Sequence, residues 1–301
     1  MILAAIDIGS NAARLLITET SFYKDGTVDF TKLNLLRIPL RLGMDVFDKG
    51  YVSDEKKGKL IETLKTYKLL MNIYDVQAFK ACATSAMRDA ANGPEILKEI
   101  KEETGLDIRI ISGDEEANII YETHIAENLS HNKSYMYIDV GGGSTEITMF
   151  SQNQIQFKQS FNIGTIRLLN NKVTDEQWDM MKRYVKTYAR TCQPLEAIGT
   201  GGNINKIFSI SKRKEGRPLS LQLLRDYYKE LSNVPMEERK HLYHFHDDRA
   251  DVIVPALQIY TSVMRWANAE EIYVPKIGLA DGLIKVLYAE LTAAKQTIKA
   301  E

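Results

Sequence analysis

Several features that define other classes of protein are scarce in this sequence or missing from it. The 301 residues include two cysteines, Cys82 and Cys192, which lie far apart and outside any metal-ligand spacing. A disulfide framework and a cysteine-based zinc site are therefore not expected, and a reducing compartment such as the cytoplasm is. No apolar run approaches the roughly 18 residues of a membrane-spanning helix.

Charge of one sign is not in excess either. Lysine and arginine together number 39 and aspartate and glutamate 40, which gives a formal net charge of −1. A general DNA-binding protein is usually clearly basic, so DNA is not an expected partner. The apolar N-terminus carries Asp7 and Arg14 and lacks the basic start of a signal peptide, so no membrane partner is expected.

Two common nucleotide-binding motifs are also missing. The sequence has no G-x-x-x-x-G-K-[ST] phosphate loop and no G-x-G-x-x-G after a strand. What the chain does have is enough hydrophobic residues, 44%, to build real cores, and a length that indicates about two domains.

A repeated pattern is the first positive signal. Residues 4–17, "AAIDIGSNAARLLI", and residues 137–150, "YIDVGGGSTEITMF", both read as an apolar strand, an aspartate, a turn and a second strand. Asp7 aligns with Asp139 and Gly9 with Gly141, about one domain apart. The pattern indicates a duplicated domain in which each half opens with a hairpin. Two unrelated hairpins are the alternative, because Asp-x-Gly is common at turns.

Strand-like and helix-like segments alternate through the rest of the chain, which predicts an α/β fold with mixed sheets. Residues 249–269 are predicted to be one long helix despite Pro255, after a polar loop. The other expected strands and helices lie in residues 28–42, 53–74, 76–85, 94–105, 106–112, 113–128, 154–169, 174–192, 194–210, 220–232 and 270–295.

Glycine-rich turns supply the candidate chemistry. Backbone N–H groups at such turns cradle phosphate oxygens, and glycine allows a close approach. The candidate turns are Gly9–Asn11, Gly141–Ser144, Gly164–Thr165 and Gly199–Gly202. Phosphate chains bring Mg²⁺, which needs hard oxygen ligands. Asp139 and Glu146, with Asp7 from the other half, are the expected metal ligands, although Asp139 could instead cap its own turn.

Six segments in this order carry a resemblance to a known family: "IDIGSNAARLLI", "ATSAMRDAANGPEIL", "ISGDEEANIIY", "YIDVGGGSTEI", "NIGTIRL" and "DRADVIVPAL". Together they resemble the exopolyphosphatase/guanosine pentaphosphate phosphohydrolase (Ppx/GppA) family, in its short two-domain form, from about residue 2 to 290. The resemblance implies two ribonuclease-H-like lobes of the actin-like ATPase superfamily around an interlobe cleft. We expect lobe I at 1–124, completed by the C-terminal helix 281–301, and lobe II at 125–280.

The resemblance also implies roles for acidic residues. Glu116, in "SGDEEA", matches the catalytic base of the family, and Glu115 matches a less essential position. From the residues alone, both acids could simply complement the dipole at the start of a helix. Asp139 and Glu146 match family acids needed for activity, which implies Mg²⁺ as the cofactor.

Arginines match family residues that reach substrate phosphates. They are Arg14, Arg88 and Arg249. Arg167 in "GTIRL" is a weaker candidate. Arginine binds phosphate oxygens bidentately, although Arg88 could instead pair with Asp89, and Arg249 with its flanking aspartates. The full expected phosphate-binding set is Gly9, Ser10, Asn11, Arg14, Arg88, Gly141, Gly142, Gly143, Ser144, Thr145, Arg167 and Arg249.

The implied activity is Mg²⁺-dependent removal of the terminal phosphate from inorganic polyphosphate. The alternatives are a pppGpp 5′-phosphohydrolase that gives ppGpp in the stringent response, a kinase, and a non-catalytic ppGpp sensor. Ala12 replaces a usual hydroxyl, and Ala280–Asp281 replaces a frequent Arg–Glu. With no basic track for a long polyanion, short chains are expected to be favoured.

One further cluster, "HLYHFHDD" at 241–248, contains several possible metal ligands. Its histidine spacing fits neither one helix face nor one strand face, so a polar loop is preferred over a zinc site. Members of the family often form homodimers, so a homodimer is a possible assembly, although no interface can be named.

Overall fold

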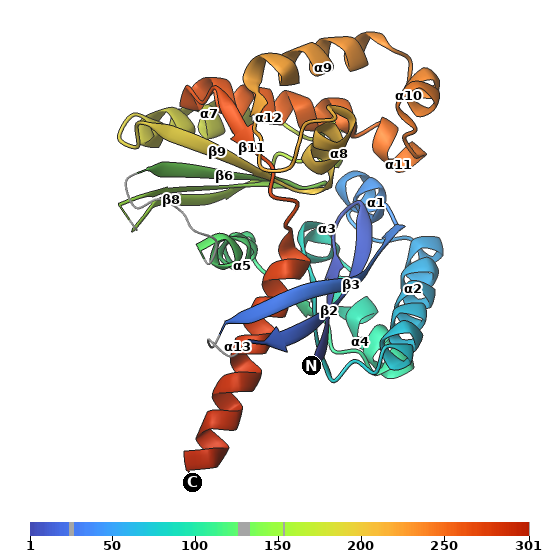
Figure 1. Cartoon of the computed structure of the whole chain (residues 1–301). Coiled ribbons are helices and arrows are strands. Elements are labelled where there is room, and N and C mark those ends of the chain that lie inside the picture. Colours follow the sequence, from blue (N-terminus) through green and yellow to red (C-terminus); the bar gives the residue numbers. More distant parts are fainter. Residues whose placement is uncertain (24–26, 126–132, 153, 301) are drawn as a thin grey trace. The chain divides into compact units, whose positions relative to one another are not determined.

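The computed structural model describes residues 1–23, 27–125, 133–152 and 154–300. The chain divides into two compact units (Figure 1). Unit 1 comprises Met1–Ser112 and Leu279–Glu301, and unit 2 comprises Gly113–Gly278. Each unit is built on its own mixed sheet. Among the described residues, no helix combines the length and the apolar character that crossing a membrane requires.

The sheet of unit 1 has the strand order β3-β2-β1-β4-β5. The first three strands along the chain form antiparallel pairs, whereas β4 runs parallel to β1 and β5 parallel to β4. Central strand β1 reads as an almost continuous apolar run because both of its faces are covered. The strands are β1 (Ile2–Ile8), β2 (Ala12–Phe22), β3 (Val28–Pro39), β4 (Ala78–Ala83) and β5 (Arg109–Ile110).

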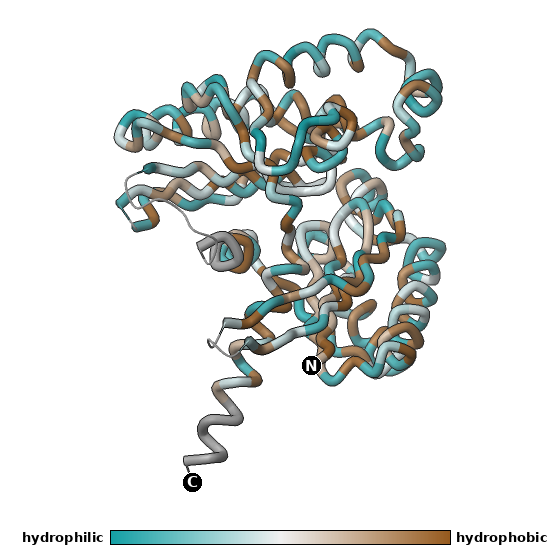
Figure 2. The backbone as a smooth tube through the Cα atoms, viewed as in Figure 1, coloured by the Kyte–Doolittle hydropathy of each residue, from teal (hydrophilic) through white to brown (hydrophobic). Residues whose placement is uncertain are grey.

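Helices cover both faces of this sheet. Helix α13 packs on β1, β2 and β4, and Figure 1 shows α2 and α4 on the opposite side. Apolar residues gather where helices meet strands (Figure 2), and the buried Tyr67 of α2 donates its hydroxyl to Ala13 O at 3.0 Å. The helices are α1 (Leu42–Lys49), α2 (Asp54–Ile73), α3 (Ser85–Asp89), α4 (Gly93–Thr104) and α13 (Leu279–Ala300).

The sheet of unit 2 repeats this topology. Its order is β10-β11-β9-β6-β7-β8, in which β6, β7 and β8 form antiparallel pairs, β9 runs parallel to β6, and β11 parallel to β9. The strands are β6 (Ser134–Val140), β7 (Thr145–Ser151), β8 (Gln154–Phe161), β9 (Leu195–Thr200), β10 (Leu219–Ser220) and β11 (Glu271–Tyr273). The duplicated domain predicted from the two hairpins is therefore confirmed, as is the fold class that the family resemblance implies.

One face of the second sheet carries the larger core. Ile138 and Ile147 point into it, where α12 packs against β6 and against α6, α7, α8 and α9. Helix α5 packs instead on β7 and β8, on the opposite side in Figure 1. The helices are α5 (Gly113–Ile125), α6 (Thr165–Leu169), α7 (Asp175–Ala189), α8 (Gly202–Ile210), α9 (Leu221–Asn233), α10 (Met236–Tyr243), α11 (Asp247–Ala250) and α12 (Ile253–Ala267).

The prediction of one long helix over 249–269 is wrong. Two helices occupy the segment, and α12 begins only at Ile253. Pro255 falls in the first turn of α12, where the N–H that proline lacks has no partner within the helix. The predicted polar loop before 249 contains a helix, α10, whose last turn includes His241.

Two other segments differ from their predicted extent. Of the strand expected over 106–112, only β5 pairs with the sheet. The predicted end of lobe I at residue 124 lies near the C-terminal end of α5, whereas the border between the units falls at the N-terminal end of this helix. The physical reason is that α5 packs on two strands of unit 2. The last residues of the predicted helix 113–128 lie outside the described part.

Candidate active site

The site in unit 2 starts from the register of one hairpin. Asp139, near the end of β6, lies directly opposite Glu146 on β7. Directly opposed residues of an antiparallel pair project from the same face of the sheet, with Cβ atoms about 5 Å apart. The Asp139 side chain therefore shares a face with Glu146 rather than pointing into the core beside Ile138.

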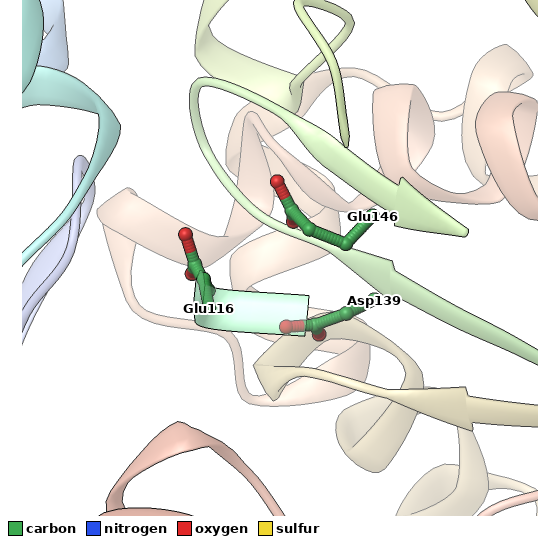
Figure 3. A group of neighbouring side chains, drawn as sticks. All are labelled: Glu116, Asp139 and Glu146. Atoms are coloured by element: carbon green, nitrogen blue, oxygen red, sulfur yellow. The ribbon is translucent and has the colours of Figure 1, made fainter. Parts of the chain in front are cut away.

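Helix α5 brings a third acid to the same face. Its first residue, Gly113, lies so close to β8 that a Cβ atom there would come within 2.4 Å of Ser160 Oγ. Lys158 of β8 also donates to Asn118 of α5 at 2.6 Å. The start of the helix is thus seated directly on the strand, and Glu116 in its first turn lies beside the hairpin acids (Figure 3).

Glu116, Asp139 and Glu146 form a compact carboxylate cluster. One ligand atom from each lies within 4.8 Å of the others, and among the described residues no other such group of three was found. The exposed fraction is 9% for Glu116 and 3% for Glu146. Each pair of like charges at this range costs about 1–4 kcal/mol. A bound divalent cation would offset that repulsion, and hard carboxylate oxygens suit Mg²⁺, so the residues fit this metal.

Two hydroxyl-bearing residues extend the acid pair across the sheet. Ser160 of β8 lies opposite Glu146 and donates to its Oε1 at 2.7 Å. Thr200 of β9 lies beside Asp139 in the parallel register. Neighbouring strands thus place Ser160, Glu146, Asp139 and Thr200 side by side on one face; we call these four residues the acid row.

The end of β9, at Thr200 and Gly201, is held in place by tight packing. Tyr260 of α12 donates its hydroxyl to the carbonyl oxygen of Thr200. Complete burial raises the pKa of Tyr260 well above its usual range, and the charge of Asp139 acts in the same direction. The hydroxyl therefore stays protonated and acts as a donor. Next to Thr200, Gly201 has φ +103°, and a Cβ atom there would lie 2.8 Å from Asp139 Oδ1.

The predicted phosphate turn, residues 141–144, is braced by α6. Thr165 N donates to Gly141 O at 3.1 Å and Ile166 N to Gly142 O at 2.8 Å. Gly164 lies so close to the turn that a Cβ atom would come within 2.4 Å of Gly142 O. These contacts direct the carbonyl groups toward α6, and among the described residues the N–H of Gly142 has no acceptor.

Three predicted phosphate-binding side chains of unit 2 have structural partners. Thr145 donates its hydroxyl to Ile163 O at 2.5 Å, and Arg167 Nε donates to Gly143 O at 2.7 Å, so both help to hold the turn. Arg249 of α11 donates to Asn203 Oδ1 at 2.8 Å, in the first turn of α8. Arg249 is thereby held close to the end of β9, on which Thr200 lies.

Unit 1 has a turn of the same construction at residues 9–11. Gly9 N donates to Ala12 O at 3.0 Å. The start of α1 braces the turn, because Arg41 N, at the N-cap, donates to Asn11 O and Gly43 N to Ser10 O, both at 2.9 Å. Arg41 itself has φ +53°, a left-handed conformation that arginine rarely adopts.

The side chains around this turn are cationic rather than acidic. Asp7 accepts from Arg14 Nη1 at 2.6 Å, and Arg37 of β3 lies opposite Arg14 in the register. Cys82 of β4 lies beside Asp7 on the other side. We call Arg37, Arg14, Asp7 and Cys82 the cation row. Burial raises the pKa of Tyr67, on which the charges of Arg14, Asp7 and Arg37 all act, so this tyrosine lies close to the row.

The predicted site residues are therefore distributed over both units. Glu116, Asp139 and Glu146 come together in unit 2, while Asp7 lies in unit 1 in contact with Arg14. Arg88 of unit 1 donates to Ile111 O at 2.9 Å, and its Nε lies 4.0 Å from Asp89. Asp7 as a metal ligand and the phosphate-binding roles stay predictions. The histidines of 241–246 are absent from the metal-capable group found in the described residues.

Sequence reasoning singled out none of three residues that the register places in these rows, namely Arg37, Ser160 and Thr200. Thr200 lies inside the predicted turn Gly199–Gly202, so a partial signal existed for it. Arg37 and Ser160 had none, because each lies beyond an irregularity in its strand pairing that the sequence does not reveal.

Comparisons with known proteins agree with the fold. The sequence model of the Ppx/GppA phosphatase family matches residues 23–291. The chain is 31% identical over 230 residues to a bifunctional 3-dehydroquinate synthase/phosphatase of Fusobacterium nucleatum, covering 70% of this chain and 34% of that protein. It is 24% identical to exopolyphosphatase 1 of Mycobacterium bovis, covering 94% of this chain and 87% of the relative.

A solved structure is similar over almost the whole chain. The exopolyphosphatase from Cytophaga hutchinsonii superposes with a TM-score of 0.82 at 25% sequence identity. The match covers 97% of this chain and 98% of that one. The similarity therefore includes both units and the elements that carry the acid row.

Proposed function

Because this chain belongs to the Ppx/GppA phosphatase family, we propose that it is a Mg²⁺-dependent hydrolase of phosphoric anhydrides, which removes the terminal phosphate of inorganic polyphosphate. One observation carries the proposal: three carboxylates from α5, β6 and β7 converge within 4.8 Å. Relatives described as exopolyphosphatases support the choice of substrate.

Each acid of the cluster has a distinct role in this proposal. Asp139 and Glu146 hold Mg²⁺, and Ser160 fixes the orientation of Glu146 through the hydrogen bond to Oε1. A bound Mg²⁺ ion supplies positive charge that stabilises the phosphate oxygens as the anhydride bond breaks. Glu116, at the start of α5, orients a water molecule toward the terminal phosphorus and accepts its proton.

Phosphate binding is assigned to backbone N–H groups and arginines. The 141–144 turn presents N–H groups to phosphate oxygens because α6 holds its carbonyl groups on the other side. Arg249 acts near the end of β9 in the same unit. In unit 1, the 9–11 turn with Arg14 and Arg88 binds phosphate. Phosphoryl transfer depends mainly on positioning and electrostatics, which these groups supply.

The preferred substrate is proposed to be a short polyphosphate chain. With a formal net charge of −1, the protein has no excess of positive charge with which to bind a long polyanion. The second candidate is pppGpp, whose terminal phosphate is attached by the same kind of bond. The two candidates differ in the leaving group and are separated by direct competition.

The test measures phosphate release, with Mg²⁺, from short polyphosphate, long polyphosphate and pppGpp. We expect the wild type to release phosphate fastest from short polyphosphate and Glu116→Gln to lose about 10²–10⁴-fold in kcat, the usual contribution of a general base. Glu115→Gln is the matched control, since it removes the same charge from the same helix turn outside the acid cluster. Its rate should stay near that of the wild type.

Two results would contradict the proposal. Equal losses in Glu115→Gln and Glu116→Gln would show that only the charge at the helix start matters. If no substrate releases phosphate and ppGpp binds tightly, the protein is a non-catalytic ppGpp sensor rather than an enzyme.

A further inference from the structure

Thr200 is the one member of the acid row whose side chain has no explained role. It is the last residue of β9, its exposed fraction is 0%, and it lies beside Asp139 in the parallel register. Parallel neighbours in register project to the same face of a sheet. The hydroxyl of Thr200 is therefore on the face that carries the carboxylate cluster.

Among the described residues, the hydroxyl oxygen of Thr200 is buried and has no hydrogen-bond partner. A buried hydroxyl without a partner costs about 1–3 kcal/mol, and valine would fill nearly the same volume without that cost. The other hydroxyls around the cluster are satisfied, since Ser160 donates to Glu146 and Thr145 to Ile163 O. Thr200 stands out from its neighbours in this respect.

The surroundings of Thr200 hold its position rather than satisfy its hydroxyl. Tyr260 bonds to the Thr200 carbonyl group, not to the side chain. Gly201 leaves the space into which Asp139 Oδ1 fits, because any Cβ atom there would come within 2.8 Å of this oxygen. Asp139 and Thr200 are thus locked side by side, with one polar group left for a ligand.

We propose that Thr200 is a positioning residue of the acid cluster, whose hydroxyl binds a water molecule of the hydrated Mg²⁺ ion next to Asp139. The inference rests on the proposed function, because it needs the metal at this cluster. Mg²⁺ gives up its waters reluctantly and usually keeps several of them when protein-bound. A hydroxyl can accept a hydrogen bond from such a water, and outer partners of this kind commonly contribute 10–100-fold to metal affinity.

The experiment compares Thr200→Val and Thr200→Ser with the wild type. For each protein, the Mg²⁺ dissociation constant is measured by calorimetric titration and the unfolding free energy by denaturant in metal-free buffer. We expect Thr200→Val to be at least as stable as the wild type without metal, because an unsatisfied hydroxyl is gone. Its Mg²⁺ affinity should fall about tenfold or more, and Thr200→Ser should restore it.

Thr104→Val is the matched control. Thr104 is also buried, but its hydroxyl donates to Ile100 O at 2.6 Å and accepts from Leu106 N at 3.1 Å. Loss of these satisfied bonds should lower stability by about 1–3 kcal/mol and leave Mg²⁺ affinity unchanged. The two threonines are therefore expected to respond with opposite patterns.

The results separate this inference from the function on which it rests. If Thr200→Val binds Mg²⁺ as the wild type does, while Asp139→Asn weakens binding, the role of Thr200 is overturned and the metal site stands. If Thr200→Val loses stability without metal, its hydroxyl has a structural role and the inference is wrong. If the wild type does not bind Mg²⁺, or Asp139→Asn binds it unchanged, both proposals fail.

Discussion

The equivalent rows of the two units differ in charge, because Arg14 stands where the other unit has Glu146, while Asp7 and Asp139 occupy the same place. The cation row of unit 1 and the acid row of unit 2 lie on the same four strands of a repeated topology. The first row has two guanidinium groups and one carboxylate, while the second has two carboxylates, a serine and a threonine in equivalent places. The comparison shows that the duplicated backbone sets where side chains project, and the sequence sets which ligand they take.

The turns beside the rows are more alike than the rows themselves. In each unit, backbone N–H groups at the start of the helix after the third strand donate hydrogen bonds to the turn between the first two strands. The side chains that hold the bracing helices and turns in place differ in charge between the units. Asp45 of α1 bonds to Ser53 and Lys56 in unit 1, whereas Arg167 bonds to a backbone carbonyl in unit 2. The shared brace indicates that both turns must be rigid.

Within the two rows, the largest expected effect comes from removing charge from the acid row. Glu146→Gln should lower kcat for phosphate release by about 10²–10³-fold, the usual loss when one electrostatic group of an active site is removed. Glu196→Gln is the control, since Glu196 lies on β9 and pairs with Lys133 away from the cluster. Similar rates for both variants would mean that the acid row has no special role.

The next effect concerns the support of Asp139. Gly201→Ala should lower the free energy of unfolding by about 1–3 kcal/mol, because alanine is strained at φ +103° and its Cβ meets Asp139 Oδ1. Gly58→Ala is the opposite control, since nothing lies within 4 Å of that position in α2 and alanine favours a helix by about 0.5–1 kcal/mol. Denaturant unfolding measures both variants, and destabilisation by Gly58→Ala would refute this reading.

A smaller effect is expected in the cation row. Arg37→Gln should raise KM for polyphosphate about tenfold and change kcat little, because charge-assisted bonds to phosphate are typically worth about 1.4 kcal/mol or more. Steady-state kinetics measure the change. Arg225→Gln, an exposed arginine of α9, serves as the control. A loss in kcat with constant KM would assign Arg37 to the chemical step instead.

The smallest expected effect is the pH dependence of the stability that Asp45 contributes in α1, the helix that braces the turn of unit 1. Burial raises the pKa of Asp45, but hydrogen bonds from Ser53 and Lys56 outweigh it and leave the pKa lowered. Because the folded-state pKa is below the unfolded value of about 3.9, the carboxylate stabilises the fold above that pH. The contribution is lost as the pH falls through the folded-state pKa.

Asp45→Asn should therefore be about 1–2 kcal/mol less stable than the wild type at pH 7, and the difference should shrink below about pH 4. Denaturant unfolding at several pH values measures it. Asp54→Asn is the control, because Asp54 is a fully exposed aspartate 3.7 Å from Lys57 and its replacement should leave stability nearly unchanged. A constant difference for Asp45→Asn down to pH 2 would contradict the argument.

Much of the acid site could be predicted because its signals are local. The alternation of β6 and β7 and the four-residue turn between them place Asp139 opposite Glu146. The acids at the start of α5 follow the usual preference of a helix N-terminus. The contact that seats α5 on β8 could not be predicted, since Gly113 and Ser160 are far apart in the sequence and meet only through packing.

By itself, the sequence predicted the duplicated fold, the two turns and the hairpin acids Asp139 and Glu146, because strand alternation and turn chemistry act over a few residues. The role of Glu116 came from the family resemblance instead. Only the tertiary structure decided which residues complete the rows. A bulge in each sheet, near Ile17–Thr18 and near Met149–Phe150, shifts the third strand by one residue. That shift brings Arg37 opposite Arg14 and Ser160 opposite Glu146, because a slip of one residue exchanges the two faces of a strand.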